Sequence, residues 1–159
     1  MGAGTWESYH AITTLLYRYA ELMDAADFDG VAKLFEHATL TNEGVEGAVK
    51  GSQAIGNLYR RTNRVHDDGT LRTRHVTTNV LTDIDERLGT ADVRSTFVVF
   101  QQTPNLPLQP IVSGRYRDHF VRRGNVWRFD QRHIAVDHVG NVSEHLTFDL
   151  AQFRTDHPG

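Results

Sequence analysis

Four long strand-like segments fill the second half of this chain, and they constrain its fold more than any other feature. Short turn signals at residues 85–89, 104–107 and 123–125 separate the segments, and connections this short predict antiparallel neighbours. Helical periodicity precedes the segments, so the order of elements predicts an α+β fold in which a curved antiparallel or mixed sheet wraps around N-terminal helices. The four segments cover approximately Leu71–Ile84, Ala91–Thr103, Gln109–Arg122 and Val126–Val139.

Three helices are predicted before the strands. The first ends at Asp24, with residues 5–8 as its N-cap region. The second begins at Asp27–Gly30, the third covers approximately Gln53–Val65, and a short strand and turn are expected over residues 38–47. Helices packed into a strongly bent sheet form a cone, which leaves an apolar small-molecule pocket between the two layers. The first helix carries apolar residues at helical spacing: Ile12, Leu15, Leu16, Tyr19 and Met23.

Composition excludes several classes of function. The chain of 159 residues is expected to form a single domain, residues 1–159. Its 17 basic residues are matched by 20 acidic ones and are not clustered, so no nucleic-acid partner is expected. It contains no cysteine, no secretory signal pattern and no apolar run of membrane-spanning length, so we expect a cytoplasmic protein with no membrane partner. No glycine-rich phosphate loop is present, and no cofactor is expected.

Asp24 and His75 form the leading candidate catalytic pair. A carboxylate at a helix C-terminus meets the negative end of the helix dipole, so Asp24 requires a cation or a hydrogen-bond donor opposite it. The segment 71–79 contains His75, and an aspartate that orients a histidine creates a general base near neutral pH. Two simpler alternatives stand beside this hypothesis. In the first alternative, Asp24 is only a solvated residue of a helix–helix turn. In the second, His75 is only a structural residue of a strand.

Several motifs of the chain resemble a known superfamily. Residues 19–29, with Tyr19 five positions before Asp24, and residues 124–129 are similar to the SnoaL-like branch of the NTF2-like α+β cone superfamily. Residues 71–75 look like the segment that carries the catalytic histidine of scytalone dehydratase. Residues 75–79 resemble hexachlorocyclohexane dehydrochlorinase, and the tyrosine–aspartate spacing resembles bile acid 7α-dehydratases. An arginine five residues after the strand tryptophan also matches the dehydrochlorinase. The resemblance implies an elimination site made of Tyr19, Asp24, His75 and Arg132.

The chain departs from these families at other positions. Scytalone dehydratase has a tyrosine where Met23 stands, its second catalytic histidine falls near Phe100, and its late serine–asparagine pair falls near Gly114 and Tyr116. The dehydrochlorinase has a lysine in place of Tyr19. The general base is therefore kept while the machinery around it differs, and scytalone is not the expected substrate. The residues expected to bind substrate are Met23, Asn79, Phe100 and Tyr116.

Strand alternation raises questions about individual residues. It places His75, Asn79 and Leu81 on one face. Near the end of the chain it separates Arg132 from Phe129, so either a bulge intervenes or the whole face is charged and Arg132 is a surface residue. Tyr19 belongs to the apolar stripe of the first helix and is equally suited to the core. A histidine metal site is only a minor alternative, because no acidic residue lies at ligand spacing from these histidines. Its ligands would be His119, His133, His138 and His145.

The residues and the resemblance together predict a cofactor-independent lyase acting on a small, apolar or aromatic cyclic molecule. An isomerase or polyketide-cyclase-type enzyme with the same dyad is the nearest alternative, and a non-catalytic binding or structural module is the second. The resemblance also implies a homo-oligomer, with a trimer favoured over a dimer. The tail from Ser143 is too apolar for a free end, so it is expected to dock on the body or on a neighbouring subunit through Leu146, Phe148, Leu150 and Phe153.

Overall fold

The computed structural model describes residues 3–148, and Leu150 and Phe153 lie outside this range. Three helices and six strands make up the described chain. The helices are α1 (Ala3–Asp24), α2 (Phe28–Leu34) and α3 (Ser52–Thr62). The strands are β1 (Thr39–Asn42), β2 (Val49–Lys50), β3 (Thr73–Asp85), β4 (Thr90–Thr103), β5 (Leu106–Arg123) and β6 (Val126–Val139).

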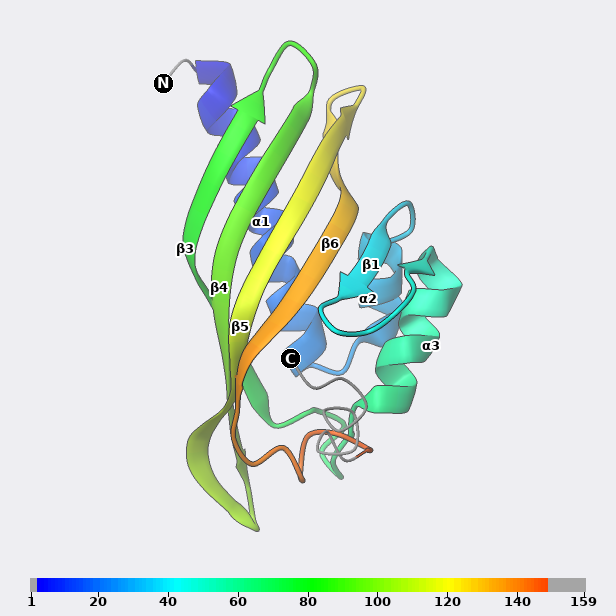
Figure 1. Cartoon of the computed structure of the whole chain (residues 1–159), viewed down its shortest axis with the longest axis vertical. Helices are drawn as coiled ribbons and strands as arrows, with labels where there is room; N and C mark the ends of the chain where they lie inside the picture. The colour runs from blue at the N-terminus through cyan, green and yellow to red at the C-terminus, as the bar shows by residue number, and fades with distance from the viewer. Residues whose placement is uncertain (1–2, 149–159) are drawn as a thin grey trace.

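The six strands form one sheet in the order β2-β1-β6-β5-β4-β3. Strands β3 to β6 are antiparallel neighbours, as their short connections predict, whereas β1 runs parallel to β6 and makes the sheet mixed. Figure 1 shows the four long strands as a tall curved sheet, with α1 running behind it and α2 and α3 gathered beside β1. The predicted α+β cone is confirmed.

The helices begin and end close to the predicted residues, with one clear exception. Asp27 caps α2, because its side chain accepts a hydrogen bond from the Gly30 N–H at 2.8 Å. The predicted N-cap region at residues 5–8 is wrong, because α1 already includes it. Ser8 instead accepts a hydrogen bond from the indole of Trp127 at 3.0 Å. The turn before β5 is also shorter than predicted, so that β5 begins at Leu106.

Two bulges decide which strand residues face the helices. In β3 the pairing with β4 shifts between Thr78 and Leu81, and Asn79 adopts a left-handed φ of 53°. The predicted common face of His75 and Leu81 is therefore wrong, since Leu81 is 59% exposed. In β6 the register shifts around Asp130, which has no partner on β5, so Arg132 shares the inner face with Phe129. This is the bulge that the sequence pattern required if Arg132 was to be internal.

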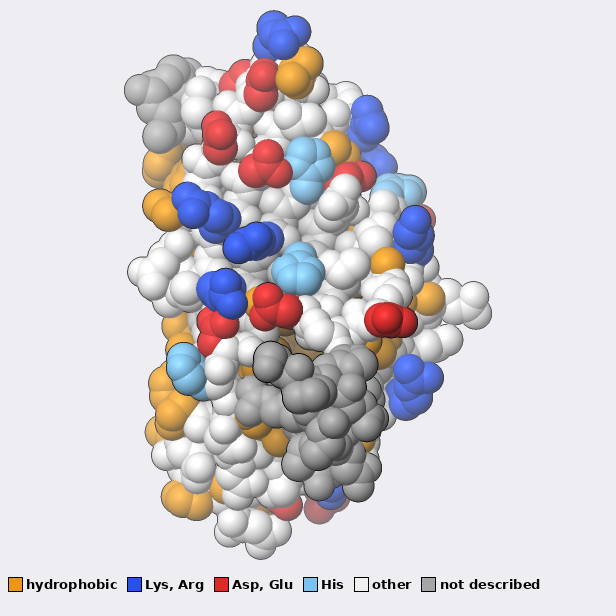
Figure 2. Space-filling view, in the orientation of Figure 1, with side chains coloured by type: hydrophobic (Ala, Val, Ile, Leu, Met, Phe, Trp, Pro, Cys, Tyr) orange, Lys and Arg blue, Asp and Glu red, His pale blue; other side chains and the backbone are white. Residues whose placement is uncertain are grey.

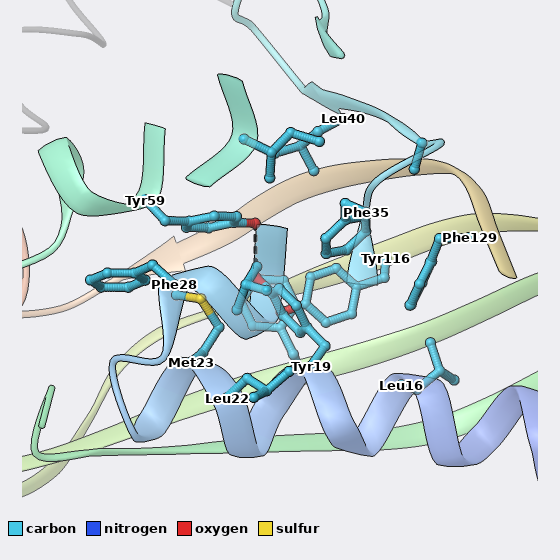
Figure 3. Packing of buried hydrophobic residues seen from close by; sticks show 14 of the residues in the cluster. Leu16, Tyr19, Leu22, Met23, Phe28, Phe35, Leu40, Tyr59, Tyr116 and Phe129 are labelled. Atoms are coloured by element: carbon cyan, nitrogen blue, oxygen red, sulfur yellow. Dashed lines mark hydrogen bonds between the residues drawn. The ribbon is translucent and has the colours of Figure 1, made fainter. Parts of the chain in front are cut away.

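The core lies between the helices and the concave face of the sheet. The apolar stripe of α1 packs there, and Ile12, Leu16, Tyr19 and Met23 are all almost fully buried. Figure 3 shows Leu16, Tyr19 and Met23 of this stripe beside aromatic residues contributed by α2, α3 and the sheet. Because the stripe is buried against strands that begin only at residue 73, α1 is held by contacts distant in sequence.

Candidate active site

Asp24 and His75 are in direct contact. The ring nitrogen Nδ1 of His75 lies 2.6 Å from Oδ1 of Asp24, and the backbone N–H of His75 donates to the same carboxylate at 3.1 Å. The hydroxyl of Thr73 donates to Oδ1 at 2.7 Å. The His75 side chain is only 7% exposed and that of Asp24 12%. Asp24 is therefore not the solvated turn residue of the simpler alternative.

The backbone at the entry to β3 sets this geometry. Asp24 is the last residue of α1, and its carbonyl oxygen accepts the N–H of Leu71 at 3.3 Å. Arg72 then takes a left-handed φ of 51°, a conformation that is uncommon for a side chain other than glycine. From there β3 presents Thr73 and His75 on alternate positions of one face, so both reach the same carboxylate.

Hydrogen bonding keeps Asp24 ionised. Burial alone would raise the pKa of its carboxyl, but the hydrogen bonds and charge of His75 and the hydrogen bond from Thr73 outweigh burial and lower the pKa below its usual value. The carboxylate is therefore negative at neutral pH. An ionised acceptor at Nδ1 fixes that nitrogen as the donor and leaves Nε2 of His75 as the basic atom.

A group of tyrosines lies beside the dyad. The ring of Tyr19 is 6.5 Å from that of His75, and its hydroxyl is 3.0 Å from that of Tyr59 (Figure 3). Tyr116 places its ring edge-on to Tyr19 at 6.1 Å. Burial raises the pKa of all three phenols. They are therefore neutral hydroxyls, able to donate hydrogen bonds, at physiological pH.

Arg132 is buried, with 1% of its surface exposed, and lies above these rings. Its guanidinium carbon is 4.4 Å from the Tyr19 ring centre and 4.1 Å from that of Tyr116. It forms a two-point ion pair with Asp118, at 2.7 and 2.8 Å. Burial acts to lower the pKa of Arg132, but the charge and hydrogen bonds of Asp118, together with smaller contributions from Tyr116 and Tyr19, raise it overall, so the guanidinium stays charged. Its third nitrogen, Nη1, is buried and has no hydrogen-bond partner among the described residues.

Two of the predicted substrate-binding residues are not brought to this site. Phe100 pairs with Arg74 on the outer face of the sheet, because the inner face of β4 is formed by its neighbours Val99 and Gln101. The bulge turns Asn79 outward, where its amide donates to Thr96 at 3.0 Å. Both placements correct the prediction, which assumed unbroken alternation and a direct correspondence with a related family.

The other predicted residues are internal. Met23 and Tyr116 are 2% and 3% exposed and belong to the same buried cluster as Tyr19. Thr73, which contacts the dyad, and Asp118, which pairs with Arg132, were not predicted as site residues. Asp118 could have been predicted from the sequence, because strand alternation places this charged residue between Tyr116 and Phe120 on a face that is otherwise aromatic.

The C-terminal segment brings one residue beside His75. In Figure 1 the end of the described chain runs along the base of the molecule toward α3. Leu146 pairs with Asn63, and the N–H of Thr147 donates to the Thr62 carbonyl at 3.1 Å. His145 is buried on this segment, with its ring 6.4 Å from that of His75. The described part of the tail therefore docks on the body of its own chain.

Two hollows in the surface lie away from the dyad. A groove of about 580 Å³ opens between α1, α2 and the start of β6, and a smaller one of about 200 Å³ lies beside β1. Neither is lined by Asp24 or His75, so the expected pocket around the dyad is not one of them. The larger groove is lined by Leu15, Leu22, Leu34, Arg18, Trp127 and Phe129, among others.

The histidines proposed as metal ligands have separate partners. His119 contacts Asp92, His133 contacts Thr41, and His138 contacts Ser113. Among residues 3–148 no group of three or more histidine and carboxylate side chains is placed to hold a metal ion.

Acidic and basic side chains are interspersed over the face shown in Figure 2. No helix within the described range is long and apolar enough to cross a bilayer.

A family model described as a SnoaL-like domain matches residues 4–133. A protein of unknown function from Mycobacterium tuberculosis has the same fold, with a TM-score of 0.70 and 25% identity over 87% of this chain and 78% of that one. An NTF2-like protein with a cystatin-like fold from Novosphingobium aromaticivorans has a TM-score of 0.69 and 23% sequence identity, over 83% of each chain. A candidate scytalone dehydratase from the same organism has a TM-score of 0.69 and 20% sequence identity, over 88% of this chain and 91% of that one. No curated protein sequence matches the chain.

Proposed function

This chain belongs to the SnoaL-like domain family, and from that premise we propose that it is a cofactor-independent lyase acting on a small, largely apolar cyclic substrate. The observation that carries the proposal is the 2.6 Å contact between Asp24 and Nδ1 of His75, at the edge of a buried aromatic cluster. A histidine held in one tautomer by a carboxylate is a general base near neutral pH.

The proposed reaction is an elimination. Nε2 of His75 takes a proton from a substrate carbon, and the electrons of that C–H bond form the new carbon–carbon double bond. The neighbouring carbon–oxygen or carbon–halogen bond breaks, and its electron pair leaves with the oxygen or the halide. A departing hydroxyl group takes the proton back from the imidazolium, so water leaves and His75 is neutral again. A departing halide leaves as the anion, and the imidazolium then releases its proton to solvent water. Asp24 stabilises the imidazolium formed between these steps.

Tyr19 and Arg132 are proposed to stabilise negative charge that develops on the substrate. Tyr19 offers a neutral hydroxyl, and Arg132 offers the partnerless donor Nη1. Donors that are already oriented and buried need no rearrangement during the reaction, so they stabilise developing charge more strongly than water does. Asp118 holds the guanidinium in position through its two-point contact.

The test is turnover of a β-hydroxy ketone. Dehydration of 3-hydroxycyclohexanone gives cyclohex-2-enone, whose conjugated double bond is followed by its ultraviolet absorbance. A chlorinated cyclohexane, followed by chloride release, tests the halide alternative. Incorporation of deuterium from D₂O next to a ketone, measured by NMR, reports proton abstraction alone and would also detect an isomerase or cyclase. His75→Ala is the negative control, and equal turnover in that variant would contradict the proposal.

A non-catalytic binding module is the second candidate. The observation that favours it is the position of the 580 Å³ groove, which the dyad does not line, together with the 7% exposure of His75. In this case Asp24 and His75 would serve only to join α1 to β3. A protein that binds apolar rings but exchanges no substrate proton, with or without His75, would support this alternative.

A further inference from the structure

His145 is a buried titratable residue that the proposed elimination does not use. It is 6% exposed, and its Nδ1 has no hydrogen-bond partner among the described residues. Native proteins rarely leave a buried polar nitrogen unpaired, because it loses its hydrogen bonds to water without replacement. Its ring lies edge-on to that of His75, with the ring centres 6.4 Å apart and the ring planes inclined by 62°. The ring that carries the unpaired nitrogen is therefore next to the candidate base.

The segment that carries His145 is fixed by backbone contacts. The His145 carbonyl accepts the N–H of Arg64 at 2.8 Å. The carbonyl of Glu144 accepts the amide of Gln101 at 3.0 Å and lies 2.9 Å from Nε2 of His66. These contacts tie the tail to the loop that follows α3 and to β4. His145 is thus held in place as part of the wall around His75.

His145 is neutral at physiological pH. Burial, with a further contribution from His75, lowers its pKa to about 4. A neutral imidazole offers one N–H donor and one lone pair and carries no charge. It is a poor acid, so it polarises a substrate oxygen by hydrogen bonding without transferring a proton, as neutral histidines do in other enzyme sites.

We propose that His145 is a substrate contact and selects molecules that carry a carbonyl or hydroxyl oxygen beside the carbon deprotonated by His75. The inference rests on the proposed function and narrows it to oxygenated substrates, hence to dehydration over dehydrohalogenation. Carbon-bound halogens are weak hydrogen-bond acceptors, so a halocarbon would leave Nδ1 unpaired. A site built to hydrogen-bond an oxygen discriminates strongly against analogues that lack it.

Binding of two probes with the same carbon skeleton tests the proposal. 1-Tetralone carries a ketone oxygen and tetralin does not. Affinities for both are measured by calorimetry for the wild type, His145→Leu and His145→Asn, with His138→Leu as a control on the outer part of the sheet. The preference for tetralone over tetralin is expected to fall about tenfold in His145→Leu, the usual effect of one hydrogen bond. His145→Asn keeps a polar atom near Nδ1 and is expected to retain much of the preference.

NMR of ¹⁵N-histidine-labelled wild-type protein gives a second measurement that does not depend on any variant folding. Tetralone is expected to shift the Nδ1 resonance of His145, and tetralin is not. An unchanged preference in His145→Leu, or no Nδ1 shift with saturating tetralone, would overturn the proposal. His75→Ala separates the two ideas. If His75→Ala loses proton exchange but keeps the preference for tetralone, both the lyase proposal and the role of His145 are supported. Proton exchange that survives in His75→Ala would contradict the lyase proposal but not the role of His145. An unchanged tetralone preference in His145→Leu, or an unshifted Nδ1 resonance, would contradict the role of His145 but not the lyase proposal.

Discussion

Nδ1 of His75 lies 2.6 Å from Oδ1 of Asp24, although 51 residues separate the two in sequence. The carboxylate also accepts the His75 backbone N–H and the Thr73 hydroxyl, so one side chain both orients the imidazole ring and fixes the start of β3 to the end of α1. The dyad is therefore a structural joint as well as a candidate catalytic pair, which shapes the design of its variants.

Removal of the proposed base should lower turnover without unfolding the protein. We expect His75→Ala to reduce turnover of 3-hydroxycyclohexanone by about 100- to 10,000-fold, the usual value of general-base catalysis. Asp24→Asn keeps the acceptor oxygen but not the charge, and a loss of similar size is expected. The double variant should lose little more than either single one, because both disable one unit. Steady-state kinetics measure these losses, with His119→Ala as a matched control outside the cluster. Additive losses would show that the two residues act independently.

The Thr73 hydroxyl is expected to help keep Asp24 ionised. Thr73→Val preserves shape but removes a donor 2.7 Å from the carboxylate, so the pKa of Asp24 should rise toward its usual value. Thr73→Ser restores the donor and should restore the low pKa. Carboxyl ¹³C NMR titration measures both variants. An Asp24 pKa that is the same in Thr73→Val and in the wild type would assign the shift to His75 alone.

The buried ion pair between Arg132 and Asp118 should be costly to break from one side. Asp118→Leu leaves an unpaired buried guanidinium, and the free energy of unfolding is expected to fall by about 3–5 kcal/mol. Replacing both partners, with Asp118→Leu and Arg132→Met, should cost less than the single change. Urea denaturation measures both. Arg115→Met, which breaks the exposed pair with Asp137, is the matched control and should have little effect. If Asp118→Leu and Arg115→Met lower the free energy of unfolding equally, burial does not make the Arg132–Asp118 pair costly to break.

His145 should make stability depend on pH between about 6.5 and 4. Its pKa is lowered from 6.5 to about 4 in the folded protein, so between these values the unfolded chain binds the extra proton and the folded one does not. Stability is therefore lost as pH falls through this range, by about 3 kcal/mol, and changes no further from this group below pH 4. Denaturation at several pH values compares the wild type with His145→Asn, which should lack this loss. An identical pH slope in both proteins would show that His145 is not buried as a neutral group.

The chain is expected to assemble into a homo-oligomer, with a trimer ahead of a dimer. Exposed hydrophobic residues on three long strands, Val76, Leu108 and Val136, are suited to burial between copies. Light scattering at micromolar concentration measures the mass directly. A monomer would contradict the expectation, and Leu108→Lys should weaken assembly if this surface is used.

The fold was predictable because its signals are local. Turn residues, strand-length apolar runs and the change from helical to alternating periodicity each depend on neighbours within a few positions. The Asp24–His75 pair was also predictable, because a carboxylate at a helix end requires a donor and the resemblance indicated which one. The boundaries at residues 5–8 and 104–107 were less accurate, since propensity alone does not determine where hydrogen bonding starts.

By itself the sequence determined the helices, the four long strands and the chemical types available for a site. Only the tertiary structure decided which of those residues meet. The bulge at Asp130 brought Arg132 inside, and the bulge at Asn79 turned that residue out, because one extra residue reverses the face of every side chain that follows. The tertiary structure also placed His145 against His75, by way of backbone contacts from the tail to α3 and β4. Such contacts join residues far apart in the chain, and no local pattern records them.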